Sequence, residues 1–397
     1  MKIVLVSTWY SENMGYSENT LPKSLAYLGH EVHLITSTAQ VYYNSKFYDS
    51  TYRKFIGPPI LEPVSKQIDG YTLHRLPLKE KLLGIKIEGL IDKVAEIKPD
   101  IVQTFDIDGL NTYSLALAQP KFGYKLFTEM HMHASVYPSY QTKKLLRIIK
   151  WYWKWGRFLK KINDATVLCY PIAADCADIA KIVFKVPENK LKIQSLGTDT
   201  QLFKLITTPL EAEQRKEIRN QFGFTDADIV CVYTGRITKD KSPSVLAEAI
   251  KILHQRNETH YKALFVGIGE KEEVEKIKNT PGCVVKNFVP VFDLPKYYQA
   301  SDIAVWPNQE STSQLDAIAC GLPLIINDTV TIKERVEGNG LFYKLMDTKD
   351  LANKLLDLKN ESIRKEYGEA GVTKAQNQFS WIKIASERVK DYTLLSL

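Results

Sequence analysis

The feature that most constrains the fold of this chain is an alternation of short β-branched runs with stretches of helical period, which stops once and then starts again. In the first half the predicted strands are residues 2–7, 31–36, 71–76, 100–105, 125–129 and 165–169. In the second half they are residues 229–235, 262–267, 283–288, 302–307 and 323–327. Strands that alternate with helices imply right-handed crossovers and a parallel sheet. The sequence therefore predicts an α/β protein with two doubly wound units.

The interruption sets the expected domain boundaries. A charged connection follows the first series of strands, so we expect one domain over residues 1–203 and a second over residues 204–379. Residues 38–70 are rich in Pro and Tyr and are expected to be an irregular insertion. Residues 380–397 read as an amphipathic helix that packs either locally or back on the first domain. A ligand is expected in a cleft between the two units.

Several classes of protein are excluded by the apolar and cysteine patterns. The longest apolar runs are far shorter than the roughly 20 residues of a membrane-spanning helix. The N-terminal run turns polar early and reads as a first strand rather than a signal peptide, so we expect a cytoplasmic protein. The five cysteines are scattered without metal-ligand spacing, and no metal site or cofactor is expected.

The basic excess of the chain is local. Of 53 basic residues against 46 acidic ones, eight lie between Met130 and Asn163, a segment without Asp or Glu. A helix over about residues 142–162 would carry a cationic stripe flanked by aromatic side chains, formed by Lys143, Arg147, Lys150, Trp151, Trp153, Lys154 and Arg157. We expect it to dock peripherally on the inner, anionic face of a membrane. The alternative is a basic helix that attracts an acidic or phosphorylated glycan; a nucleic-acid partner is not expected, because basic residues do not cluster elsewhere.

Two motifs of the second unit place charged groups after predicted strands. Gly235 and Arg236 end one strand, and Lys241 precedes the next helix. Because ligands of doubly wound sheets bind beyond the carboxyl ends of the strands, these cations can bind a diphosphate and stabilise it as a leaving group. The other motif combines a predicted helix start with acceptors for sugar hydroxyls, and it consists of Glu310, Ser311, Thr312, Ser313 and Asp316.

Other candidates are weaker by their sequence alone. Gly267 and Gly269 permit close approach of a base or phosphate, but the absence of a third glycine there, and after the first strand near Gly15, argues against a nicotinamide-dependent dehydrogenase. His131 and His133 leave a strand end and can contact a sugar, bind a metal weakly, or simply be satisfied within a loop. A D-x-D at Asp106 and Asp108 is interpreted as a loop.

Together these motifs resemble the large retaining glycosyltransferase family with the GT-B fold (glycosyltransferase family 4, "glycosyl transferases group 1"), which includes glycogen synthases and bacterial lipopolysaccharide transferases. The resemblance covers nearly the whole chain, in the motifs at residues 25–36, 197–203, 235–241, 266–270, 294–307, 316–323 and 379–385. It implies two Rossmann-like domains facing a cleft, a nucleotide-diphospho-sugar donor on the second, and a glycan or lipid-linked acceptor on the first. It also implies metal-independent transfer with retention of anomeric configuration.

The resemblance also implies roles for single residues. Arg236 and Lys241 would hold the diphosphate, and Asp316 would hold the ribose hydroxyls. His131 would lie near the donor hexose, and Gly15 would allow close approach of the donor to the backbone at the cleft. The family's carboxylate eight residues before Asp316 is replaced by Asn308, so either Asn308 or Glu310 would contact the donor sugar. Asp316 is shorter than the family's glutamate, and Ser242 replaces the usual glycine after the lysine.

Two other functions fit the same motifs. A nucleotide-sugar epimerase shares the fold and would use the same cations, but it needs acid/base carboxylates that the sequence does not place. A glycan or sugar-nucleotide binding protein without turnover would need no leaving-group stabilisation. The presence of both Arg236 and Lys241 favours an enzyme over a binding protein. The family resemblance favours a transferase, in bacterial cell-surface polysaccharide or glycoconjugate synthesis.

Overall fold

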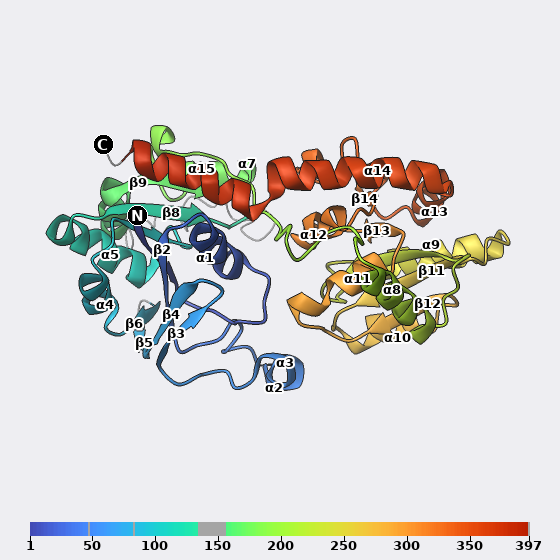
Figure 1. The fold of residues 1–397 in the computed structure, drawn as a ribbon, viewed down its shortest axis with the longest axis horizontal. Coiled ribbons are helices and arrows are strands. Elements are labelled where there is room, and N and C mark those ends of the chain that lie inside the picture. The colour runs from blue at the N-terminus through green and yellow to red at the C-terminus, as the bar shows by residue number, and fades with distance from the viewer. Residues whose placement is uncertain (47, 82–83, 134–155, 396–397) are drawn as a thin grey trace. The chain divides into compact units, whose positions relative to one another are not determined.

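The chain forms two compact units in a computed structural model that describes residues 1–46, 48–81, 84–133 and 156–395 (Figure 1). Unit 1 comprises Met1–Leu196 and Ile384–Leu397, and unit 2 comprises Gly197–Lys383. The expected domains were 1–203 and 204–379. Their boundaries lie seven residues after Leu196 and four residues before Lys383, the last residues before the chain changes unit. The chain thus passes from unit 1 to unit 2 and returns with its last helix.

Unit 1 is built on a seven-stranded sheet of order β3-β4-β2-β1-β7-β8-β9. Its strands are β1 (Lys2–Ser7), β2 (Glu31–Ser37), β3 (Val64–Ile68), β4 (Tyr71–Leu76), β7 (Ile101–Thr104), β8 (Lys125–Met130) and β9 (Thr166–Pro171). A hairpin of β5 (Leu78–Lys81) and β6 (Gly84–Ile87) lies outside this sheet. All six strands predicted in this half are confirmed. Every pairing in the sheet is parallel except β3 with β4.

The region of residues 38–70 is more regular than we expected. It contains α2 (Tyr48–Thr51), α3 (Arg53–Ile56) and the edge strand β3. The β3 strand is hard to see in the sequence because it is exposed along most of its length and therefore lacks a buried alternating face. The remaining helices of unit 1 are α1 (Ser17–Tyr27), α4 (Leu90–Ile97), α5 (Gly109–Phe122), α7 (Ala174–Ile182) and α15 (Trp381–Leu394), with a 3₁₀ turn η1 (Glu188–Lys190) and a helical segment over 156–165.

The α15 helix is bound to unit 1 by a buried ion pair. Arg388, at the centre of the helix and fully buried, pairs with the buried carboxylate of Glu129 on β8 and donates to Gln194 Oε1 at 2.7 Å. Its guanidinium also lies 4.6 Å from the centre of the Tyr170 ring. The helix is amphipathic as predicted, and its buried face includes Trp381, Ile384, Arg388 and Tyr392.

Unit 2 is built on a six-stranded sheet of order β12-β11-β10-β13-β14-β15, with every pairing parallel. Its strands are β10 (Ile229–Thr234), β11 (Tyr261–Val266), β12 (Cys283–Lys286), β13 (Ile303–Trp306), β14 (Leu324–Asn327) and β15 (Gly340–Tyr343). The first five confirm the predicted strands, and β15 was not predicted. The helices are α8 (Pro209–Gln221), α9 (Ser244–Gln255), α10 (Lys271–Lys278), α11 (Pro295–Gln299), α12 (Ser313–Ala319), α13 (Thr348–Asp357) and α14 (Glu361–Lys374), followed by a π-helical turn, η4 (Ala375–Phe379). The 3₁₀ turns are η2 (Val291–Asp293) and η3 (Lys333–Arg335).

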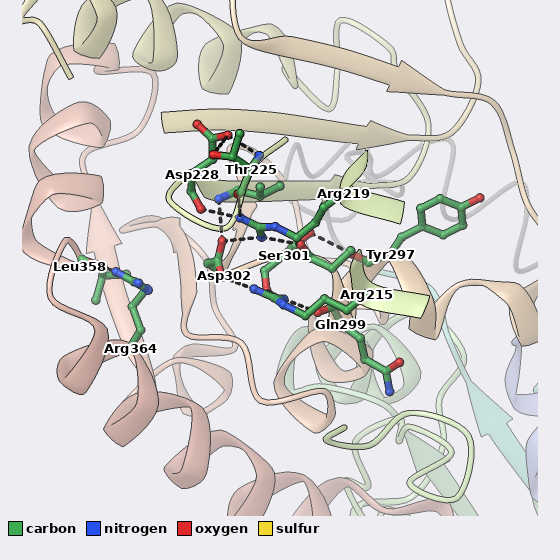
Figure 2. A network of polar contacts seen from close by, with 12 residues as sticks. Arg215, Arg219, Thr225, Asp228, Tyr297, Gln299, Ser301, Asp302, Leu358 and Arg364 are labelled. Carbon is green, nitrogen blue, oxygen red and sulfur yellow. Dashed lines mark hydrogen bonds and ion pairs between the residues drawn. The ribbon is translucent and has the colours of Figure 1, made fainter. Parts of the chain in front are cut away.

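The charged connection at the start of unit 2 is held by arginines. In Figure 2, Arg215 and Arg219 of α8 both point at Asp302, which immediately precedes β13. Arg215 Nη2 lies 2.9 Å from Asp302 Oδ1, and the buried Arg219 Nη1 lies 3.2 Å from Oδ2. Arg219 also donates to the carbonyl oxygens of Thr225 and Asp228 at 2.7 and 2.6 Å. These contacts tie α8 to the amino ends of β10 and β13.

Candidate functional site

The two predicted phosphate-binding cations follow β10, a central strand of the unit 2 sheet. Arg236 is well exposed, with its guanidinium 3.9 Å from the Asp240 carboxylate. Lys241 is half-buried. Burial lowers the pKa of Lys241 and the neighbouring Arg236 lowers it further, while Asp240 and Glu310 oppose this. The two positive charges therefore stand close enough to repel each other, an arrangement that an anionic ligand would relieve.

The loop after β13 is tied to the loop that carries these cations. Asn308 Nδ2 donates to the carbonyl oxygen of Asp240 at 3.0 Å, and Asn308 Oδ1 accepts from the backbone N–H of Gln309 at 2.9 Å. Gln309 has a φ of 56°, in the left-handed region that non-glycine residues seldom adopt. Glu310 Oε1 accepts from the Thr331 hydroxyl at 3.4 Å. Asn308 thus helps to hold the loop that carries Arg236 and Lys241, and the Glu310 carboxylate is directed to the residues after β14.

Asp316 lies in α12 and accepts a hydrogen bond that the sequence did not predict. Thr198 Oγ1 donates to Asp316 Oδ1 at 2.6 Å. Burial raises the pKa of Asp316 to about 7, with the Thr198 hydrogen bond and the more distant Arg335 acting in the opposite direction. A carboxyl group with this pKa can both accept from and donate to sugar hydroxyls near neutral pH.

Thr198 is positioned by backbone hydrogen bonds between two motifs that are distant in the sequence. Its backbone N–H donates to the Phe379 carbonyl oxygen at 2.7 Å, and its carbonyl oxygen accepts from the Trp381 N–H at 3.1 Å. The motifs at 197–203 and 379–385 both contributed to the family resemblance, but the sequence alone gave no sign that they pair.

The start of α12 is capped by Ser311 rather than by Thr312. Thr312 occupies the cap position without a side-chain hydrogen bond, whereas Ser311 Oγ accepts from the Ser313 N–H at 3.3 Å. The Ser311 carbonyl oxygen accepts from Arg335 Nη1 at 3.0 Å. Anion binding by the amides of Ser311, Thr312 and Ser313 stays a prediction, and α12 has only seven residues.

The glycines after β10 and β11 are required by the packing of this chain itself. A Cβ on Gly267 would lie 1.9 Å from the Gly235 carbonyl oxygen, and a Cβ on Gly269 would lie 1.8 Å from that of Ile237. Gly235 and Gly267 also have φ values of 141° and 154°. Their role in binding a base or phosphate stays a prediction, since close contact between the two loops already explains them.

His131 of unit 1 belongs to a charged cluster at the end of β8. Its Nε2 lies 2.6 Å from Glu129 Oε2, and Glu129 in turn pairs with Arg388. Burial lowers the pKa of His131, but the carboxylates of Glu129, Glu18 and Asp106 outweigh it and raise that pKa above its usual value. The imidazole is therefore held in a fixed orientation and favoured in its charged form.

The remaining predicted residues of unit 1 fall into three groups. Gly15 is exposed in the loop between β1 and α1. Asp106 and Asp108 lie between β7 and the start of α5, in the turn that we predicted to be a loop, and burial raises the pKa of Asp106 to about 7. Of the basic and aromatic stripe only Arg157 is described, and it is exposed. The others, Lys143, Arg147, Lys150, Trp151, Trp153 and Lys154, lie outside the described residues.

Within the described ranges, no helix has the length and apolar character that crossing a membrane requires.

Comparison with known proteins shows a similarity to glycosyltransferases. Residues 228–361 match the family model described as "Glycosyl transferases group 1". The alpha-monoglucosyldiacylglycerol synthase of Acholeplasma laidlawii is 23% identical over 340 residues, which cover 81% of this chain and 79% of that protein.

Solved structures agree on the fold. A glycosyltransferase from Rickettsia africae superposes with a TM-score of 0.69 at 16% identity, covering 99% of this chain and 98% of that one. HepE from Anabaena, solved in complex with UDP-glucose, gives a TM-score of 0.68 at 17% identity over the full length of both chains. The chain therefore has the GT-B fold of these glycosyltransferases, and its residues 228–361 are similar to the group 1 glycosyl transferases.

Proposed function

We propose that this glycosyltransferase moves a hexosyl residue from a nucleotide-diphospho-sugar to a glycan or lipid-linked acceptor, with retention of anomeric configuration and without a metal ion. The observation that carries the proposal is the pair Arg236 and Lys241 at the carboxyl end of β10, in a loop held by Asn308. The relative from Acholeplasma is named for synthesis of a glucosylated diacylglycerol, and HepE was solved with UDP-glucose, which support a lipid acceptor and a nucleotide-sugar donor. The same comparisons favour a transferase over the epimerase and the binding protein.

In the proposed reaction, the acceptor hydroxyl forms a bond to the anomeric carbon as the bond from that carbon to the diphosphate oxygen breaks. The nucleoside diphosphate leaves with the bonding electrons and takes the acceptor proton. Arg236 offers two parallel donors to the phosphate oxygens and Lys241 a compact charge, so both stabilise the negative charge that develops on the leaving group. Attack from the face of the departing group accounts for retention without a covalent enzyme intermediate.

A direct assay tests this function. The purified chain is incubated with candidate nucleotide-sugars, with and without diacylglycerol or glycan acceptors. We expect nucleoside diphosphate release that depends on the acceptor, and a product whose anomeric proton shows the configuration of the donor sugar. An inverted product would contradict the proposed mechanism, and epimerised donor in place of transfer would contradict the reaction class.

Transfer is expected to continue in excess chelator and without added Mg²⁺ or Mn²⁺. The reason is that two protein cations, rather than a metal ion, are available for the diphosphate. The measurement is the initial rate before and after treatment with EDTA. A rate that falls with EDTA and is restored by Mg²⁺ or Mn²⁺ would contradict this prediction and would direct attention to Asp106 and Asp108.

Peripheral binding to an anionic membrane is proposed for the basic and aromatic stripe. Each basic residue near such a surface contributes about 1 kcal/mol, and salt weakens the attraction. We expect the wild-type chain to sediment with anionic vesicles at low salt, and a variant with Lys150, Lys154 and Arg157 changed to Glu to remain in the supernatant. Equal sedimentation of the two proteins would leave the alternative, attraction of an acidic glycan by the same helix.

A further inference from the structure

The ends of β8 and β9 bring a histidine, an aspartate and a cysteine together in unit 1. The two strands are neighbours in parallel register, with Met130 opposite Pro171. His133 follows β8, and Asp175 and Cys176 lie in the first turn of α7, which follows β9 (Figure 1). The topology of the sheet therefore places the three side chains at one edge.

The possible ligand atoms of these three side chains lie close to one another. His133 Nδ1 lies 3.1 and 3.3 Å from the two oxygens of Asp175 and 3.7 Å from Cys176 Sγ. One ligand atom from each residue fits within a mutual separation of 4.8 Å. In a tetrahedral zinc site with bonds of about 2.0 Å to nitrogen and oxygen and about 2.3 Å to sulfur, the expected separations are about 3.3 Å for N to O and about 3.6 Å for N to S. The two separations measured from His133 Nδ1 agree with those of zinc ligands, and small side-chain movements would bring the oxygen and the sulfur, within 4.8 Å of each other, to the remaining distance.

The geometry differs from that of a nucleophile with its base. In a Cys-His-Asp triad the thiol and the carboxylate contact different nitrogens of the ring. Here both contact Nδ1. An ion pair between His133 and Asp175 would explain the 3.1 Å contact, but it would not require a thiol at the same nitrogen.

The chemistry of the three groups indicates the metal. A mixed set of nitrogen, oxygen and sulfur suits Zn²⁺, whereas Mg²⁺ and Ca²⁺ prefer oxygen alone. Cys176 is fully buried and fixed in α7, while the side chains of His133 and Asp175 are 25% and 21% exposed. The sulfur is thus held by the core and the other two ligands face the surface, so an ion can enter.

We propose that His133 Nδ1, one carboxylate oxygen of Asp175 and Cys176 Sγ bind a single Zn²⁺, with water or a further ligand in the fourth position. The ion would link the segment after β8 to the start of α7 and so stabilise the carboxyl edge of unit 1. This is a revision of the expectation, drawn from the scattered cysteines, that the chain has no metal site. The proposal concerns binding in unit 1 and does not depend on the proposed function.

Direct binding measurements on the full chain test the site. Metal-free protein is titrated with Zn²⁺ alone, and Co²⁺ is used as a spectroscopic substitute. We expect one equivalent of Zn²⁺ per chain, a rise in melting temperature, and a sulfur-to-cobalt charge-transfer band. Uptake of clearly less than one equivalent without a change in melting temperature would overturn the proposal.

Matched cysteine variants decide which thiol binds. Cys176→Ser should lose the charge-transfer band and weaken Zn²⁺ binding by about a hundredfold or more, since even partners outside the ligand shell are worth 10- to 100-fold. Cys283→Ser removes another buried thiol, in unit 2, and should keep both properties. His133→Ala, at a partly exposed position, gives a second ligand variant in case Cys176→Ser fails to fold. A band that survives in folded Cys176→Ser, or weakens equally in Cys283→Ser, would contradict the assignment.

Discussion

Replacing Arg236 or Lys241 with Ala should reduce kcat by about a hundredfold or more while the fold stays intact, because removing one donor to a developing oxyanion costs about that factor. Both side chains follow the central strand β10, and neither lies in the hydrophobic core. The loss should fall mainly on kcat, since the charge that they stabilise is greatest in the transition state. The measurement is the steady-state rate of nucleoside diphosphate release with saturating donor.

Lys239 provides the control for this experiment. It belongs to the same loop but pairs with Glu272 at 2.8 Å and is largely exposed. Lys239→Ala should therefore retain a rate within a few-fold of wild type. Wild-type turnover in Arg236→Ala or Lys241→Ala, or a loss in Lys239→Ala as large as theirs, would remove these two cations from the proposed mechanism.

The largest expected effect on stability is that of Arg388→Ala, which removes the partner of the buried Glu129. Breaking a buried ion pair from one side costs about 3–5 kcal/mol because the other charge stays buried without its partner. For a unit of this size, about 2–4 °C per kcal/mol converts this into a fall of about 6–20 °C in the melting temperature. Differential scanning calorimetry of the full chain measures it.

Arg388→Ala also changes the surroundings of the Glu129 carboxylate. Glu129 also contacts His131, so loss of Arg388 leaves His131 as the nearest cation to that carboxylate. The exposed Lys390 on the same helix is the control, and Lys390→Ala should change the melting temperature by less than about 2 °C. A melting temperature unchanged in Arg388→Ala would show that α15 does not depend on this pair.

The strands of both sheets could be predicted because most of them are buried and therefore rich in β-branched residues. All eleven predicted strands are present. The hairpin strands β5 and β6 were missed, and so were two strands of the sheets. These two are β3, an exposed edge strand, and β15, a short strand in which a Cβ on Gly340 would lie 1.9 Å from the Leu324 carbonyl oxygen. Neither has the continuous apolar run from which a buried parallel strand is predicted.

The candidate site was predicted in part. Charged residues after strands are visible in a sequence, which is why Arg236, Lys241 and His131 could be proposed as site residues. Thr198 and Arg388 were not, because each acts through a partner more than a hundred residues away, Asp316 and Glu129 respectively. The group of His133, Asp175 and Cys176 was missed because the histidine is more than 40 residues from the other two, and the three come together only when β8 and β9 pair.

The central claim is that unit 2 binds a nucleoside diphosphate through Arg236 and Lys241, and thermal shift measurements with UDP, GDP, ADP, CDP, dTDP and their sugars test it most directly. A ligand at a hundredfold excess over its Kd stabilises the folded state by about 2.7 kcal/mol. We predict that at least one base raises the melting temperature by several degrees in the wild-type chain and in Lys239→Ala. In the Arg236→Ala, Lys241→Ala double variant the same ligand should give no shift. A panel without any shift, or a shift of equal size in the double variant, would contradict the account.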